Sequence, residues 1–176
     1  MQYVVETDRL LLRKIVPQDA HDLFVLDSDP LVNKFLGNKP VQSIEESIKI
    51  IAHVQKQYEQ NGIGRWAVIL KESNALIGWS GLKLEDGIRA ESYYDLGYRF
   101  MPKYWNKGFA TEAAIASLKY GFETLNYPSI CAAADVNNEA SNNVIQKCGL
   151  VFIETFMFEN ALHNWYRLTK EKWLET

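Results

Sequence analysis

The sequence predicts an α/β (α+β) fold in which antiparallel strands lead into a β-α-β unit, so that helices flank both faces of one mixed, mostly antiparallel sheet of about seven strands. Three observations predict this class. Helical and extended hydrophobic periods alternate along the chain, a glycine turn joins a cleanly alternating strand to a helix, and two apolar strands follow the last predicted helix. The 176 residues fit one domain, 1–176.

The start of the chain predicts one strand and two short helices. Residues Leu10 to Ile15 form an apolar run suited to a strand. Pro17 then opens an amphipathic helix, because proline is well placed in a first helical turn. Asp29-Pro30 ends this helix, and a second helical piece closes at Gly37. The inner face of the first helix is expected to hold Ala20, Leu23, Phe24 and Leu26.

A longer helix is expected from Ser43 to Asn61. Glu45 and Glu46 in its first turn complement the helix dipole, and Gly62 follows its end. The apolar residues at helical spacing are Ile44, Ile48, Ile51 and Tyr58.

The middle of the chain changes to the two-residue period of strands. Residues Trp66 to Leu70 and Ala75 to Leu82 flank a short turn and predict a hairpin. The stretch from Ser92 to Phe100 alternates and ends before Pro102, because proline cannot continue a strand ladder. One face of this strand carries Tyr94, Leu96, Tyr98 and Phe100.

The last third predicts two helices and three strands. Helical spacing begins at Thr111 and stops before Pro128, and residues 130–136 form an apolar strand. Asn137-Asn138 opens another helix, which Gly149 closes, and two strands follow near 151–158 and 162–169. The inner stripe of the first of these helices is expected to hold Ile115, Leu118, Phe122 and Leu125.

Composition and charge disfavour several classes of function. The 19 Lys and Arg against 22 Asp and Glu give a net charge of −3, which does not suit a dedicated nucleic-acid binder. No segment approaches the roughly 18 apolar residues of a membrane span. Cys131 and Cys148 lack metal-type spacing and the histidines are scattered singly, so neither a metal site nor a disulfide framework is predicted. A cytoplasmic protein is expected.

The turn around Gly108 is the strongest local signal in the sequence. It joins the alternating strand to the helix near Thr111, where the first helical N–H groups have no partner and the helix dipole is positive. Such a turn can bind a pyrophosphate, and Gly108 and Ala110 keep bulky side chains out of its way. The alternative is that Gly108 only allows a tight turn and that no ligand binds there. Neither the Walker-type nor the dinucleotide-binding glycine pattern is present.

The stretch from Tyr98 to Ala113 resembles the acetyl-CoA-binding motif of the GNAT N-acetyltransferases. The core of that motif is Gln or Arg, two variable residues, Gly, one variable residue, and then Gly or Ala. Gly108 and Ala110 match it, whereas Trp105 departs at the first position, as the branch resembling the RimJ and RimL ribosomal-protein acetyltransferases often does. Three further stretches resemble that branch: Glu6 to Arg13, Ala75 to Leu82, and Asn138 to Ser141 continued by Lys147 to Leu150.

The resemblance implies a GNAT fold with a splayed sheet and acetyl-CoA as cosubstrate. The pantetheine arm would lie between the strand that ends at Phe100 and the strand near Ala134, paired with backbone groups of Phe100 and Met101. Asn138 and Ser141 would lie near it, and Asn143 stands where a basic residue is common. The amides that would hold the pyrophosphate are those of Asn106, Lys107, Gly108, Phe109, Ala110 and Thr111.

Two residues are candidates for the chemistry. A primary amine is mostly protonated at neutral pH, so a carboxylate is needed to take its proton. Asp95 stands about where related enzymes carry a catalytic glutamate, although it can instead pair with Arg99 on the same strand face. Ile145 replaces the tyrosine that many members use toward the leaving thiolate. Ser141 is the nearest hydroxyl, and its alternative role is to cap the helix.

The amine acceptor is expected to bind among the early helices and the hairpin. Phe35, Trp66 and Trp79 are candidates to line that pocket, and core packing is the alternative for each. The acidic remainder of the chain would suit a cationic amine.

The sequence therefore predicts an acetyl-CoA-dependent N-acetyltransferase. It would act on a protein N-terminus or a small amine by direct attack in a ternary complex, with no metal, no direct nucleic-acid partner and no membrane contact. A homodimer is left open. A catalytically silent acyl-CoA-binding or sensing module is the alternative from another class, motivated by Ile145 and the unsettled role of Asp95.

Overall fold

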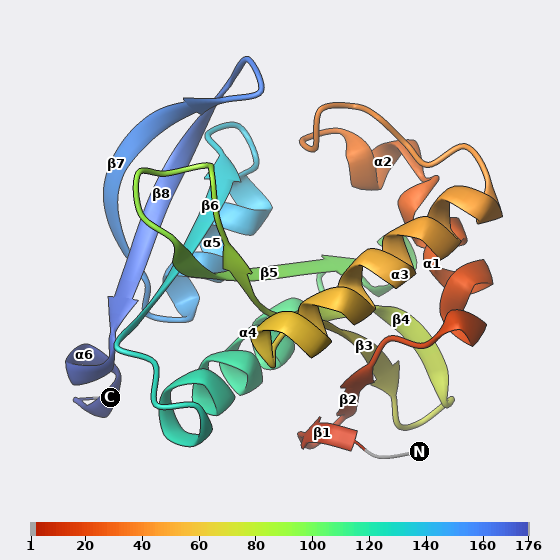
Figure 1. Ribbon diagram of the computed structural model, residues 1–176, viewed down its shortest axis with the longest axis horizontal. Coiled ribbons are helices and arrows are strands. Elements are labelled where there is room, and N and C mark those ends of the chain that lie inside the picture. Colours follow the sequence, from red (N-terminus) through yellow and green to blue (C-terminus); the bar gives the residue numbers. More distant parts are fainter. Residues whose placement is uncertain (1–2, 176) are drawn as a thin grey trace.

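Eight strands form one sheet in the computed structural model, which describes residues 3–175 (Figure 1). Their order in the sheet is β1-β2-β3-β4-β5-β6-β8-β7. The pairing of β5 with β6 is parallel and joins Asp95 to Cys131, whereas the other neighbours are antiparallel. The strands are β1 (Tyr3–Glu6), β2 (Leu10–Lys14), β3 (Arg65–Leu70), β4 (Ala75–Glu85), β5 (Tyr93–Phe100), β6 (Ser129–Asp135), β7 (Val151–Phe158) and β8 (Ala161–Thr169).

Helices cover both faces of the sheet. Helices α1 and α3 contact β4 from one side, and α4 contacts β4 and β5 from the other. A π-helical turn at Tyr120–Thr124 continues α4, and 3-10 turns lie at Pro17–Asp19 and Pro102–Tyr104. The helices in the described part of the chain are α1 (Ala20–Asp27), α2 (Pro30–Asn33), α3 (Ile44–Asn61), α4 (Phe109–Lys119), α5 (Glu139–Lys147) and α6 (Lys170–Leu174).

The predicted fold class and order of elements are confirmed, with two additions. The eighth strand is β1, which is short and only half-buried in its centre, so its sequence carries no clear alternating pattern. Helix α6 follows β8 and begins where the Thr169 side chain accepts a hydrogen bond from the Lys172 amide. Neither element has the length or periodicity by which strands and helices are predicted.

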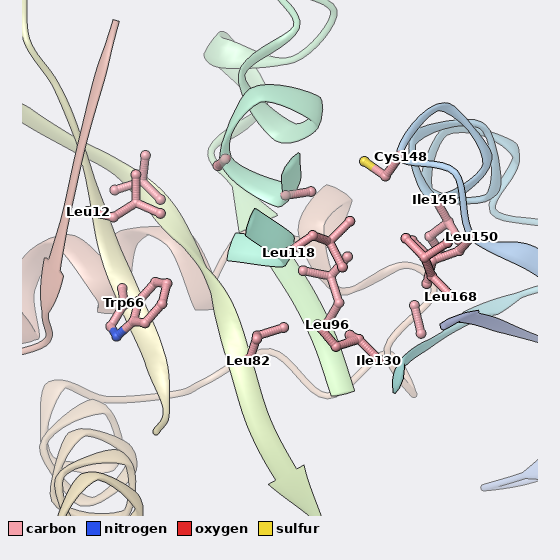
Figure 2. Close-up of a cluster of buried hydrophobic side chains, with 14 of the residues drawn as sticks. Leu12, Trp66, Leu82, Leu96, Leu118, Ile130, Ile145, Cys148, Leu150 and Leu168 are labelled. Carbon is pink, nitrogen blue, oxygen red and sulfur yellow. The ribbon is translucent and has the colours of Figure 1, made fainter. Parts of the chain in front are cut away.

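Each face of the sheet has its own hydrophobic core. Figure 2 shows the larger one, in which Leu118 of α4 lies near Leu96 of β5. The smaller core lies under α1 and α3 and contains Leu23, Ile51 and Met101. Alternation along β3 divides neighbouring residues between the two, because Trp66 belongs to the larger core and Ala67 to the smaller.

The predicted inner stripes of α3 and α4 were partly wrong. Ile44 and Ile48 are 38% and 49% exposed, and the buried stripe of α3 runs instead through Ser47, Ile51 and Tyr58. Ile115 of α4 is 40% exposed. Small side chains face the sheet in its place, so that α4 packs close to β4 and β5. These buried residues of α4 are Ala113, Ala114, Ala116 and Ser117.

The sheet splays where its two halves meet. Beyond the single register pair of Asp95 with Cys131, β5 and β6 separate toward their C-terminal ends (Figure 1). The start of α4 follows β5, and the start of α5 follows β6. The gap is therefore bordered by strand edges and by two helix N-termini. No helix within residues 3–175 is long and apolar enough to cross a membrane.

Candidate active site

The end of β5 presents backbone groups to the gap. The Met101 amide donates to Ile77 of β4 at 3.0 Å, so the backbone of Phe100, one residue earlier, is turned toward the opposite edge and β6. The Phe100 carbonyl accepts a hydrogen bond from the Trp105 indole at 2.7 Å. Met101 differs from the sequence expectation, because its carbonyl also has a partner, the Tyr104 amide, and its side chain is buried. Phe100 is thus the better placed of the two.

The predicted glycine turn forms the start of α4. Asn106 and Gly108 have φ angles of 59° and 80°, in the left-handed region that Gly and Asn adopt most easily. Gly108 is the N-cap residue, and its carbonyl accepts from the Glu112 amide at 3.0 Å. The preceding amides in the first turn have no acceptor in the described chain. These free N–H groups, on Phe109, Ala110 and Thr111, are available to an anion.

Residues near the N-terminus hold this turn in place. Arg9 donates to the Lys107 carbonyl at 3.0 Å, lies 4.4 Å from the centre of the Phe109 ring, and pairs with Glu112 at 2.6 Å. Thr7 also donates to Glu112, at 2.6 Å. Partial burial opposes ionisation of Glu112, but the bonds from Thr7 and Arg9 outweigh it and lower its pKa. The segment from Glu6 to Arg13 therefore holds the turn around Gly108 in place.

The start of α5 lies on the other side of the gap. Asn138 accepts from the Ser141 amide at 3.1 Å and so caps the helix. The hydroxyl of Tyr98, on β5, lies 3.0 Å from the Ser141 carbonyl and 3.1 Å from the Ser141 hydroxyl. Burial raises the pKa of Tyr98, so its hydroxyl stays protonated at neutral pH. The sequence had placed Tyr98 only as an inner-face residue, and its contact with Ser141 had no sequence signal.

Asn142 organises the same helix and was missed by sequence analysis. Its side-chain amide donates to the Asp135 and Asn138 carbonyls at 2.9 and 2.8 Å. Its oxygen accepts from Tyr166 at 2.7 Å and from Asn164 at 2.9 Å. Four satisfied hydrogen bonds on a buried amide fix α5 against β6 and β8. Its position beside Ser141 in the motif was the available clue.

Asp95 pairs with an arginine, but not with the one expected. Its carboxylate accepts from Arg65 of β3, which also donates to the Asp95 carbonyl at 2.6 Å and to the Gly81 carbonyl. Arg99 instead pairs with Asp27 of α1 at 2.6 Å. Burial raises the pKa of Asp95 despite the opposing charges of Arg65 and Lys83.

A cavity of about 340 Å³ is bordered by α1, α3 and the segment from Asn33 to Val41, and by Arg65, Trp79 and Arg99 of β3, β4 and β5. Trp79, one of the three residues predicted to bind the acceptor, lines this cavity. Trp66 does not, because it is buried in the other core with its ring edge-on to Tyr120 at 5.2 Å. Phe35 does not line it either; its neighbour Leu36 does. Trp66 lies on the other side of the sheet because alternate residues of β3 face opposite cores.

Comparison with known proteins identifies the family. Residues 9–151 match the model of the acetyltransferase (GNAT) domain. An N-acetyltransferase of Bacillus subtilis, YoaA, whose role is uncharacterized, is 33% identical over 90% of each chain. The chain belongs to the GNAT acetyltransferase family. As a GNAT member it is an acetyl-CoA-dependent N-acetyltransferase.

Solved structures with low sequence identity share the fold of this GNAT enzyme. The spermidine N-acetyltransferase of Vibrio cholerae, in complex with CoA and spermine, superimposes with a TM-score of 0.77 at 21% identity, over 96% of this chain and 99% of that one. The ribosomal-protein-S5-alanine acetyltransferase of Vibrio fischeri gives a TM-score of 0.71 at 18% identity, over 96% and 97% of the two chains. The structures that share this fold thus include a ribosomal-protein acetyltransferase.

The residues present fit acetyl-CoA. At Phe100 the strand edge faces the splayed gap, where the carbonyl is bonded to the Trp105 indole and the amide is left for an extended arm, and the first amides of α4 form a cradle for a pyrophosphate. At Gly108 the φ of 80° favours glycine, whereas a Cβ there would make only an ordinary contact with the Arg9 guanidinium, at 3.4 Å. Lys107 lies exposed beside this cradle. Within residues 3–175, no group of three or more His, Cys, Asp or Glu side chains is placed to hold a metal ion.

Proposed function

We propose that this enzyme transfers the acetyl group to a primary amine bound in the Trp79 cavity, by direct attack within a ternary complex. One observation carries the proposal. Arg99 and Phe100 are consecutive residues of β5, and the Arg99 side chain lines the cavity while the Phe100 backbone faces the gap. An amine in the cavity and an extended cofactor arm in the gap would therefore meet at the end of β5.

Bound acetyl-CoA supplies an activated acetyl group as a thioester. The chain holds that arm by the Phe100 backbone and the α4 amides, and the departing sulfur needs a hydrogen-bond donor. Ser141 supplies one. The single proton of the Tyr98 hydroxyl can bond the Ser141 carbonyl, which leaves the Ser141 hydroxyl free to turn toward the sulfur. Ser141 is the proposed catalytic donor and Tyr98 its positioning residue.

Asp95 is proposed to act through Arg65 rather than as the general base. Its carboxylate is held by that arginine, and it is not among the residues that line the cavity. With Asp95 so engaged, the amine would enter in its neutral form or pass its proton to water, and orientation would supply most of the acceleration. The activity of Asp95→Asn distinguishes the two roles, because loss of a general base lowers kcat far more than loss of a partner for Arg65.

The test of the function is cofactor binding followed by turnover. Acetyl-CoA should raise the melting temperature, and CoA should be released in the presence of at least one amine from a panel of small amines and N-terminal peptides, with acetylated product seen by mass spectrometry. Absence of both effects would contradict the proposal. Tight cofactor binding without turnover would support the silent-module alternative, which the buried Ile145 at the usual tyrosine position favours.

The cofactor site itself is tested by a matched pair of charges on α4. Ala110→Asp adds a negative charge to the first turn, where it suits the helix dipole but repels a pyrophosphate, so affinity for acetyl-CoA should fall about tenfold or more while circular dichroism shows a folded protein. Ile115→Asp adds the same charge at an exposed position of the same helix and should leave affinity near the wild-type value. Equal affinities in the two variants would refute the α4 site.

A further inference from the structure

The Trp79 cavity is lined by more positive than negative charge. Its charged residues are Arg65, Arg99, Lys39 and Asp27, three cations against one carboxylate. The remaining wall is largely apolar and includes Ile51 and Val54 of α3. A volume of about 340 Å³ lies at the lower end of the range for small-molecule sites. The cavity therefore suits a small molecule with an apolar part and a negative group.

Ion pairing does not remove the positive excess. Asp27 neutralises Arg99 at 2.6 Å, and Arg65 pairs with Asp95, which is outside the cavity lining. Lys39 is exposed and forms no ion pair within residues 3–175. With both pairs counted, one positive charge is left at the cavity. A polyamine would add positive charge to this site, whereas a carboxylate would complement it.

Arg99 has hydrogen-bond donors to spare. A guanidinium carries five N–H donors, and in the described chain Asp27 is the acceptor that Arg99 reaches. Both terminal nitrogens of Arg65, in contrast, already donate to Asp95 and Gly81. The Arg99 side chain is 23% exposed, and its guanidinium carbon lies 5.1 Å from the centre of the Trp79 ring, which fixes its orientation. Arg99 can thus offer a fixed fork to a carboxylate.

We propose, resting on the proposed function of the same site, that the acceptor is an amine that carries a carboxylate, of the class of free amino acids with an apolar side chain. The carboxylate binds Arg99 and Lys39, and the apolar side chain contacts Trp79 and the α3 wall. Because Phe100 follows Arg99 along β5, this carboxylate anchor holds the amine next to the strand end that borders the gap. The polycationic type of acceptor favoured by overall charge is replaced by a zwitterionic amino acid, whose carboxylate complements the local positive charge.

Equilibrium binding tests this class directly. The probes are L-leucine and L-phenylalanine, their carboxamides, and spermidine, each titrated calorimetrically into the whole protein with and without CoA. Each amino acid should bind about tenfold or more tightly than its carboxamide, and more tightly than spermidine, because a charge-assisted hydrogen bond is lost in the amide. Undetectable binding of both amino acids, equal binding of acid and amide, or a preference for spermidine would overturn the assignment.

Binding also separates this inference from the proposed function. If no amine of the panel releases CoA, the transfer function fails, yet a carboxylate preference in the titration still supports the anion site. If amines are acetylated but the carboxamides bind as well as the acids, the function stands and the substrate class is wrong.

Variants identify the residues that bind the carboxylate. Lys39→Met and Arg99→Gln should each weaken amino-acid binding about tenfold and leave carboxamide binding unchanged. Lys34→Met removes an exposed lysine of the same segment that does not line the cavity, and should change neither. Arg99→Gln leaves the buried Asp27 without its partner, so folding is checked by circular dichroism; Lys39→Met carries no such risk. Wild-type binding by Lys39→Met and by folded Arg99→Gln would overturn the proposal.

Discussion

Arg65 makes side-chain contacts that exist only in the assembled sheet. Its side chain starts on β3 and crosses Gly81 of β4 and Gly97 of β5, which pair in register, to reach Asp95. A Cβ at Gly97 would lie 2.5 Å from the Arg65 guanidinium, so the glycine leaves the space for this crossing. The sequence could offer only Arg99 as a partner, because residues at even spacing along one strand, here four apart, share a face and can be paired from the sequence pattern. The true partner is 30 residues away.

Removing Arg65 should destabilise the fold through Asp95. Arg65→Met leaves the largely buried carboxylate without its partner and should lower the free energy of unfolding by about 3 kcal/mol in urea denaturation. The double variant Arg65→Met with Asp95→Asn removes the unpaired charge and should recover part of that loss. Asp95→Asn alone should keep kcat within a few-fold of wild type while it lowers stability. A folded Asp95→Asn protein with a kcat reduced a hundredfold or more would restore Asp95 as the base.

The Tyr98–Ser141 contact predicts a graded loss of turnover. Ser141→Ala removes the proposed donor to the sulfur and should lower kcat about tenfold, with KM for acetyl-CoA little changed. Tyr98→Phe keeps the Ser141 hydroxyl and should have a smaller effect on kcat. Lys147→Ala, an exposed change on the same helix, is the control. Full kcat in Ser141→Ala would show that another group serves the sulfur.

The hairpin of β3 and β4 could be predicted from the sequence, but its close contact with β5 could not. Its strands and turn follow from the sequence pattern, and residues Ala75 to Leu82 were recognised as family-like. The pairing is irregular between Val68 and Ile69, where β4 passes from Gly78 to Leu76. At Gly78 the backbone of β5 approaches so closely that a Cβ would lie 2.1 Å from the Arg99 carbonyl oxygen. Gly78 thus lets the end of β5, at Arg99 and Phe100, pack directly on β4. No local sequence pattern indicates this contact.

Gly78→Ala should therefore damage both stability and cofactor binding. The added methyl group cannot avoid backbone atoms of β5, so the free energy of unfolding should fall by about 2 kcal/mol or more, and KM for acetyl-CoA should rise as Phe100 is displaced. The control is Gly87→Asn, because Gly87 has a φ of 86° that asparagine tolerates and open space around it. Comparable losses in both variants would show that generic glycine replacement, rather than contact with β5, is responsible.

The architecture of the molecule could be predicted wherever strands and helices have a regular hydrophobic period. Strand alternation and helix boundaries produced seven of the eight strands and the order of the main helices, whereas β1 and α6 are too short to leave a pattern. The Gly108 turn, proposed to bind the cofactor, was predictable because its residues lie in one contiguous segment. The cavity proposed for the acceptor was not, because its wall combines α1, α3, β3, β4 and β5, and its charges come from residues as far apart as Asp27 and Arg99. The net charge of the chain is negative, whereas the charge that lines this cavity is positive, so the net charge was a poor guide to the acceptor.

Buried tyrosines predict how stability responds to alkaline pH. Burial raises the pKa of Tyr58 to about 12, against the hydrogen bond from the Ile15 amide at 3.0 Å, while its own hydroxyl donates to the Arg65 carbonyl. The unfolded chain loses this proton near pH 10, so above that pH the folded state binds more protons and stability falls as pH rises. Below pH 10 the contribution of Tyr58 is fully present, and it is lost between about pH 10 and 12.

The corresponding measurement is urea denaturation from pH 8 to pH 11.5. The wild-type free energy of unfolding should be flat to about pH 9.5 and then decline, with Tyr58 contributing about 2 kcal/mol of the loss by pH 11.5. Tyr127, whose pKa burial also raises to about 12, adds to the decline. Tyr58→Phe should be less stable at pH 8, because hydrogen bonds across β2, α3 and β3 are lost, but its stability should vary less with pH. Tyr3→Phe, at a 44% exposed position, should keep the wild-type slope, and an unchanged slope in Tyr58→Phe would mean that the ring is not buried in solution.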